Sequence, residues 1–196
     1  MRTHRSGWSR AIAIPAALAI AALASGSASA LAQTGGSPAP GSPTTTTSPT
    51  QPTTGVATLA PDGTAIPPVD APRAVRKAIN AGNRIHTYPY IWGGGHNRKF
   101  KGRGYDCSGA VSYVLHAAGM LRFPMASGPL ARSWGVPGVG QWITVYANKT
   151  HAYAVIAGLR WDTSAVGESL NQGSGPRWRA TQRSPVGYTA KYAPGY

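Results

Sequence analysis

The only cysteine of this 196-residue chain lies in a short motif that can support nucleophilic chemistry. Cys107 stands between Asp106 and Ser108, directly before a segment whose apolar residues recur with the spacing of one helix face. It therefore falls in the first turn of a predicted helix, where free backbone N–H groups and the helix dipole favour a thiolate. The alternative is a small buried apolar side chain, which is common for free cysteine. We predict a nucleophile.

A cysteine nucleophile needs a base, and histidine is the usual one. His151 opens a predicted strand, from which an imidazole can reach the start of a neighbouring helix, as in Cys–His hydrolases. A histidine at a strand edge that bonds a backbone carbonyl is the other interpretation. The other four histidines are less suitable as the base. His4 lies in an N-terminal leader, His86 at the border of the first helix, and His116 on the far face of the Cys107 helix. His96 lies in a basic loop and is the second candidate for the base.

The same side chains do not match the spacing of a metal site. His86, His96, Cys107 and His116 contain no closely spaced ligand pair of the kind that zinc sites use. A single cysteine cannot form an intramolecular disulfide, although the chain has the leader of an exported protein. We predict no metal and no other cofactor.

Two helices are expected to position these residues. The first begins at Asp70, which can cap it, and its apolar stripe continues to Gly82. The second begins at Cys107 and stops at Gly119. Both are short and amphipathic, so each needs a partner surface on which to pack.

The strands follow the helices along the chain. Two apolar runs, 141–146 and 151–157, form a predicted antiparallel hairpin, and a third strand is predicted at 160–163. The Gly- and Pro-rich segment 120–140, which precedes the hairpin, is expected to be irregular. Helices followed by a small antiparallel sheet indicate an α+β fold.

Several of these motifs resemble those of the NlpC/P60 cysteine peptidases, papain-like domains that hydrolyse peptidoglycan stem peptides. The resemblance covers roughly residues 71–170. It rests on Tyr90-Ile91-Trp92-Gly93-Gly94, Asp106-Cys107-Ser108-Gly109, Ala117-Ala118-Gly119 and the strand that opens on His151. It implies a papain-like NlpC/P60 domain with helices packed on a small antiparallel sheet.

The resemblance also implies a role for each matching residue. Cys107 would be the nucleophile and His151 the base. Tyr90 matches a family tyrosine whose hydroxyl helps to stabilise the oxyanion, with a backbone N–H at the helix start as a second donor. The alternation of Tyr90 with neighbouring aromatic residues also fits simple core packing. Ser108 is grouped with Tyr90 as a predicted oxyanion or substrate contact.

At the third catalytic position the chain departs from the family. The family usually has a polar residue there, often histidine, and no histidine follows His151. Asp162 and Thr163 occupy this neighbourhood, and the register of the hairpin decides which of them shares a face with His151. If the numbers of paired residues add up to an odd number, Asp162 lies on that face, and if they add up to an even number, Thr163 does. We predict Asp162, because a carboxylate fixes the imidazole tautomer and stabilises the imidazolium better than a hydroxyl does.

Composition divides the chain into three parts. Residues 1–32 have three arginines, an apolar run and small residues at a cleavage site, which predicts a secretory signal peptide. Residues 33–69 are rich in Thr, Ser and Pro and are predicted to be a disordered linker. Residues 70–196 are the predicted NlpC/P60-like catalytic domain.

The charge of the chain favours acidic partners. Nineteen Lys and Arg face five acidic residues, for a net charge of +14. For an exported protein, the polyanions available are peptidoglycan and anionic cell-wall polymers. No nucleic-acid-binding motif is present, and we expect a monomer with no stable membrane insertion after signal cleavage. The basic, aromatic segment 175–191 either contacts such a polymer or packs by its tryptophan.

The combined prediction is a cysteine peptidase that hydrolyses peptide bonds in peptidoglycan stem peptides during wall remodelling or lysis, secreted and extracellular or wall-associated. The resemblance suggests the bond between D-glutamate and a diamino acid. Two alternatives stay open: a catalytically inactive wall-binding module, and a Cys–His acyltransferase on the same scaffold.

Overall fold

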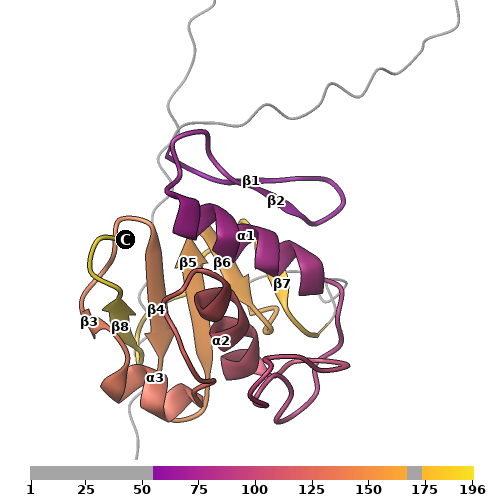
Figure 1. Cartoon of the computed structure of the whole chain (residues 1–196), viewed down its shortest axis with the longest axis vertical. Helices are drawn as coiled ribbons and strands as arrows, with labels where there is room; N and C mark the ends of the chain where they lie inside the picture. Colours follow the sequence, from indigo (N-terminus) through magenta and orange to yellow (C-terminus); the bar gives the residue numbers. More distant parts are fainter. Residues whose placement is uncertain (1–54, 167–173) are drawn as a thin grey trace, which may run out of the picture. The chain divides into compact units, whose positions relative to one another are not determined.

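The chain folds as helices packed against an antiparallel sheet, as the computed structural model of residues 55–166 and 174–196 shows (Figure 1). The predicted α+β fold class is therefore confirmed. The predicted signal peptide and residues 33–54 of the predicted linker lie outside the described residues. Among the helices described, none is both long and apolar enough to cross a bilayer.

The main sheet has six strands, and every neighbouring pair in it is antiparallel. In spatial order they are β3 (Val136–Pro137), β8 (Thr189–Tyr192), β4 (Ile143–Ala147), β5 (Ala152–Ile156), β6 (Leu159–Asp162) and β7 (Arg177–Arg179). The predicted hairpin and third strand correspond to β4, β5 and β6, with ends that differ by a residue or two.

Three helices accompany the sheet: α1 (Arg73–Ile85), α2 (Cys107–Ala117) and α3 (Ser127–Ser133). α1 and α2 lie side by side on one face of it (Figure 1). The second predicted helix is confirmed, because Ala118 caps α2 and Gly119 follows with a φ of +79°. Glycine adopts this left-handed conformation at no steric cost, so it ends the helix.

The core lies between these helices and the central strands. Val114 and Leu115 of α2 are fully buried, as are Ala154 and Ile156 of β5. Trp161 of β6 donates its indole N–H to the Ala110 carbonyl of α2 at 3.0 Å. This bond fixes the height of α2 above the sheet, and hence the position of its first residue.

The predicted linker ends earlier than expected. A two-stranded hairpin, β1 (Thr58–Leu59) and β2 (Ala65–Ile66), lies within the segment that the composition assigned to the linker. Asn83 of α1 holds it through both the N–H and the carbonyl of Ala65, each at 2.8 Å. Strands of two residues are too short to produce an alternating pattern, and the buried side chain at Ala65 is small, so the sequence offers no signal.

Three further predictions were wrong in detail. Pro72, not Asp70, precedes α1, and the Asp70 carboxylate accepts a hydrogen bond from the N–H of Gly55 at 2.8 Å. α1 also continues past Gly82 to Ile85. The expected irregular segment 120–140 contains both α3 and β3, which depend on contacts with β4 and β8 rather than on local sequence.

The contact between α1 and β7 leaves no space at Gly82, because a Cβ there would overlap the indole of Trp178. We expect Gly82→Ala to lower the free energy of unfolding by about 1–3 kcal/mol, despite the better helix propensity of alanine. Asn80→Ala, at an exposed position of the same helix, is the control and should change it by less than about 0.5 kcal/mol. Urea denaturation of both variants tests this, and equal stability would contradict the packing argument.

Candidate active site

Asp106 organises the start of α2. It is the N-cap residue, and one carboxylate oxygen accepts the N–H of Gly109 at 2.7 Å while the other accepts the N–H of Gly93 at 3.0 Å. Cys107 is therefore the first residue of the helix and is 7% exposed. This is the position in the first turn of the helix that the sequence predicted.

The glycine loop and the helix start fit against each other so closely that only glycine is possible at the contact. The N–H of Asp106 bonds the Gly94 carbonyl at 3.3 Å, and a Cβ on Gly109 would overlap that same oxygen. The two glycine-containing motifs are therefore two sides of one contact, which explains why both are present.

His151 and Asp162 meet across two adjacent strands. β5 and β6 pair with odd sums, Ala154 with Trp161 being one pair, so Asp162 and not Thr163 lies on the His151 face. His151 Nε2 is 2.9 Å from Asp162 Oδ1. This contact leaves Nδ1 as the ring nitrogen available to Cys107.

The surroundings of His151 favour its charged form. Burial alone would lower its pKa, but the hydrogen bond with Asp162, the negative charge of that carboxylate and the nearby Cys107 outweigh burial and raise the pKa of His151 to about 9. The imidazolium is then the main form at neutral pH. The arrangement can supply a nucleophile and a proton donor from adjacent side chains.

Asp162 is a buried carboxylate with several cationic neighbours. Its side chain is 0% exposed, and Arg183 Nη1 lies 2.9 Å from Oδ2, with Arg160 Nε at 3.6 Å from the same oxygen. Burial alone would raise the pKa of Asp162, but His151, the N–H of Ser164 and Arg183 hold it below its usual value. Asp162 is thus charged, and its position is fixed from several directions.

Tyr90 lies beside the nucleophile because of a short parallel pairing. Tyr90 pairs with Tyr105, so the chain before the glycine loop runs next to the chain that leads into α2. Burial raises the pKa of Tyr90, and the nearby charges of Cys107 and Asp106 raise it further. A neutral phenol, a hydrogen-bond donor, is therefore the form next to Cys107.

Ser108 and His96 share the Asp106 carboxylate. Asp106 Oδ1 is 3.0 Å from His96 Nε2 and 3.2 Å from Ser108 Oγ, and these two atoms are themselves 3.2 Å apart. The sequence placed His96 in a mobile loop and made it only a second candidate for the base. In the structure it contacts the residues on either side of Cys107, whereas His151 contacts Asp162.

The other predicted features lie away from this cluster. His86 caps the end of α1 and bonds Asn83 O at 2.7 Å, and His116 stacks on Phe100 with ring centroids 4.0 Å apart. The tail segment forms β7, with Trp178 buried. Among residues 55–166 and 174–196, no group of three or more His, Cys, Asp and Glu side chains is arranged to hold a metal ion.

Sequence reasoning missed the arginine that supports the site. Arg183 packs over the rings of Tyr153 and Tyr188, with its Cζ 5.2 Å from each centroid, and from there it reaches Asp162. The position of Arg183 depends on the turn after β7, and no local sequence pattern predicts that position. The one available signal was the scarcity of acidic residues, since a buried carboxylate needs a cation.

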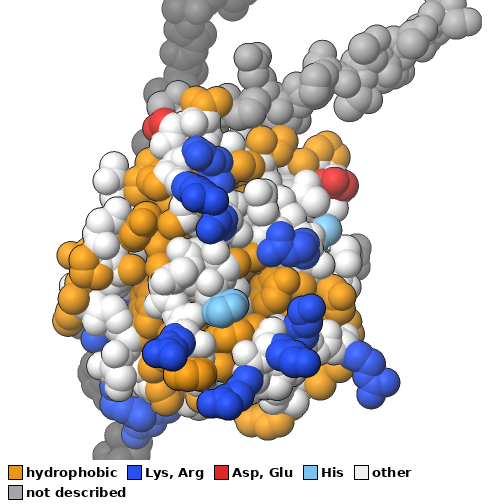
Figure 2. All heavy atoms as spheres, in the orientation of Figure 1, with side chains coloured by type: hydrophobic (Ala, Val, Ile, Leu, Met, Phe, Trp, Pro, Cys, Tyr) orange, Lys and Arg blue, Asp and Glu red, His pale blue; other side chains and the backbone are white. Residues whose placement is uncertain are grey.

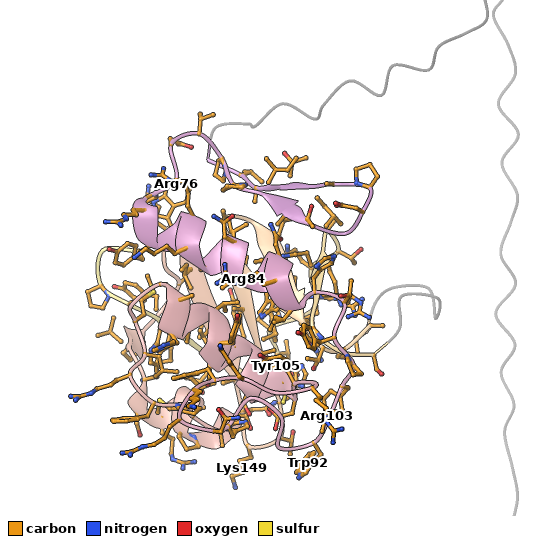
Figure 3. All side chains as sticks on the ribbon, turned by 45° about the vertical axis from the view of Figure 1, so that its right-hand side comes forward. Arg76, Arg84, Trp92, Arg103, Tyr105 and Lys149 are labelled. Atoms are coloured by element: carbon orange, nitrogen blue, oxygen red, sulfur yellow. The ribbon has the colours of Figure 1, made fainter. Side chains whose placement is uncertain are left out.

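A groove of about 470 Å³ opens over Cys107. Its lining residues are Trp92, His96, Asp106, Cys107, Ser108, Ala126, Ser127, Lys149 and Thr150. Trp92 is 85% exposed, and Figure 3 shows it at the same end of the molecule as Lys149. The groove thus offers an aromatic surface and one exposed ammonium group to a ligand that reaches the thiol.

No family model matches the chain, and no curated protein matches it. Solved structures that are similar to it include the following two. One is Rv1477, a hypothetical invasion protein of Mycobacterium tuberculosis, with 22% identity and a TM-score of 0.42 over 61% of this chain and 64% of that one, slightly less than two thirds of its length. The other is a mutated form of the resuscitation promoting factor interacting protein RipA, with 21% identity and a TM-score of 0.42 over 70% of this chain and 73% of that one.

The raised pKa of His151 predicts that stability falls in mild alkali. The unfolded value is 6.5 and the folded value about 9, so the stabilisation is complete below pH 6.5 and is lost as the pH rises through 9. The loss should be on the order of 2–3 kcal/mol. Chemical denaturation of the wild type and of His151→Gln between pH 6 and 10 tests this, and the variant should show a flatter profile. Parallel profiles would contradict it.

The choice of Asp162 over Thr163 predicts a different effect for each substitution. In Asp162→Asn the carboxylate that stabilises the imidazolium is gone, so the pKa of His151 should drop well below 9. In Thr163→Val, a buried neighbour that faces away from His151, it should stay within about half a unit. NMR titration of the His151 ring, assigned with His151→Gln, measures both, and an unchanged value in Asp162→Asn would refute the pairing.

Proposed function

We propose that the protein is a cysteine hydrolase that cleaves amide bonds in peptidoglycan stem peptides. The observation that carries the proposal is the position of His151, which bonds Asp162 at 2.9 Å and lies close enough to Cys107 for that side chain to help raise its pKa. A nucleophile, a base and a residue that orients the base in this order are the arrangement that acyl-transfer enzymes require.

The proposed reaction uses only side chains and backbone groups of this chain. In the reactive state the proton of the Cys107 thiol lies on His151, and the sulfur attacks the carbonyl carbon of the substrate amide as a thiolate beside the imidazolium. The oxyanion that forms is stabilised by N–H groups at the start of α2 and by the Tyr90 hydroxyl. The C–N bond then breaks, and the leaving amine takes the proton from His151.

Hydrolysis of the thioester completes the cycle. His151, now neutral, takes a proton from water, and the resulting hydroxide attacks the thioester carbonyl. The C–S bond breaks, the sulfur leaves as a thiolate beside the imidazolium, and the peptide leaves as a carboxylic acid that loses its proton to water. Asp162 stays charged throughout and stabilises each imidazolium that forms.

The substrate class is supported by the motifs and by the groove. The Tyr-x-x-Gly-Gly and Asp-Cys-Ser-Gly motifs resemble those of NlpC/P60 peptidases, whose substrates are stem peptides. The groove carries one exposed lysine, Lys149, and such peptides carry free carboxylates, so charge favours their binding. The predicted leader would bring the protein to the compartment that holds peptidoglycan.

Digestion of purified peptidoglycan tests the proposal. We expect the wild type to release fragments with new free amino and carboxyl ends, read by mass spectrometry, whereas Cys107→Ala and His151→Gln should lose at least a thousandfold in rate. His116→Gln, a histidine variant on the exposed side of α2, is the matched control and should keep its activity.

Other outcomes would select the alternatives. Fragments joined by a new amide bond would identify an acyltransferase. No release by the wild type, together with equal binding of wild type and Cys107→Ala to sedimented walls, would identify an inactive binding module. Release that persists in Cys107→Ala would refute a cysteine hydrolase.

A further inference from the structure

The exposed side of α1 carries four cations and one amide in a continuous row. Arg73, Arg76, Lys77, Asn80 and Arg84 follow one another at i, i+3, i+4, i+7 and i+11, and all five are exposed. We call this row the α1 stripe. Residues with this spacing lie on one face of a helix. Figure 2 shows Lys and Arg side chains gathered over α1, and Figure 3 labels two of the arginines, Arg76 and Arg84, along it.

No acidic side chain among the described residues forms an ion pair with the α1 stripe. α1 itself contains no Asp or Glu, and the two exposed acidic residues among those described, Asp62 and Asp70, bond Thr64 and the N–H of Gly55 instead. Four like charges held on one face without ion pairs favour a polyanionic ligand.

A hollow in the surface lies on the stripe. It measures about 330 Å³ and is lined by Lys77, Asn80, Arg84 and Ala117 of α2. Arg84 Nε lies 3.5 Å from the hydroxyl of Tyr113, so its two terminal nitrogens are left for a ligand. An ammonium, a guanidinium and an amide that converge on one hollow provide the donors that a phosphate group accepts.

The length of the stripe indicates a polymer rather than a single ion. Eleven residues of helix rise about 16 Å, so one phosphate can contact the hollow but cannot reach Arg73 as well. A chain of phosphate groups can contact all four cations at once, and its affinity then rises through multivalency.

We propose that the α1 stripe binds a linear phosphodiester polymer of the cell envelope, at a site separate from the Cys107 groove. Nucleic acid has the same backbone charge, but α1 has no aromatic residue on which bases could stack. The stripe also has no exposed apolar side chain to insert into a membrane. The site would hold the protein on the wall whether or not the thiol reacts.

Binding of the full chain to poly(glycerol phosphate) tests the proposal, measured by titration calorimetry at low and high salt. The variant Arg73→Gln/Lys77→Gln/Arg84→Gln should bind at least tenfold more weakly and depend less on salt. The matched control, Lys99→Gln/Lys101→Gln/Arg103→Gln, loses the same charge from an exposed loop and should bind within threefold of the wild type. Single-stranded DNA with an equal number of phosphates should bind more weakly than the polymer.

Several outcomes of the binding experiment would overturn the proposal. Equal losses in the two variants would show that net charge alone binds the polymer, and no loss in either, or no binding by the wild type, would also overturn the proposal. Tighter binding of DNA would reject the envelope polymer as the ligand. Arg73→Gln/Lys77→Gln, which keeps the Arg84–Tyr113 contact, serves if the triple variant is unstable and should still lose at least threefold.

Discussion

The buried charge of Asp162 is the constraint on which the rest of the candidate site depends. A carboxylate with no exposed surface is tolerated only when cations and donors surround it, and here His151, Arg183 and the N–H of Ser164 do so. Removing one partner of such a group typically costs about 3–5 kcal/mol. The orientation of the imidazole is thus tied to the stability of the sheet.

The nucleophile is held by a separate device, a backbone contact rather than a charge. The glycine loop meets the first turn of α2 where Gly94 and Gly109 leave no room for side chains. Asp106 then links the two through both of its oxygens. Strand register therefore determines the position of the His151 ring, and the backbone contact determines the position of the Cys107 thiol. The indole bond from Trp161 to Ala110 connects the two devices.

Strongly periodic parts of the structure could be predicted from the sequence, and parts that depend on distant contacts could not. The helix that begins at Cys107 and the β4–β5 hairpin follow from local patterns of apolar residues. The rule that links strand register to residue parity limited the partner of His151 to two residues, but the choice between them required the pairing itself.

The elements that the sequence did not predict depend on contacts with distant parts of the chain. The β1–β2 hairpin, α3 and β3 are short, and tertiary contacts stabilise them where local propensity does not. His96 is in the same class, because its place beside Ser108 follows from the path of a glycine-rich loop. Arg183 reaches Asp162 from a turn twenty-one residues further along the chain, a distance that no local pattern covers.

The strand order has a consequence for how the chain acquires its structure during synthesis. β8 lies between β3 and β4, yet it comes from residues 189–192, long after β4 ends at Ala147. Until those residues have been made, one edge of β4 has no partner, although β5, β6 and α2 are already complete. Such long-range pairing slows folding and exposes an unpaired edge in the meantime. A chain still under synthesis would thus carry the thiol and its histidine on an incomplete sheet, and the candidate site would take its final form only once residues 189–192 had paired with β4.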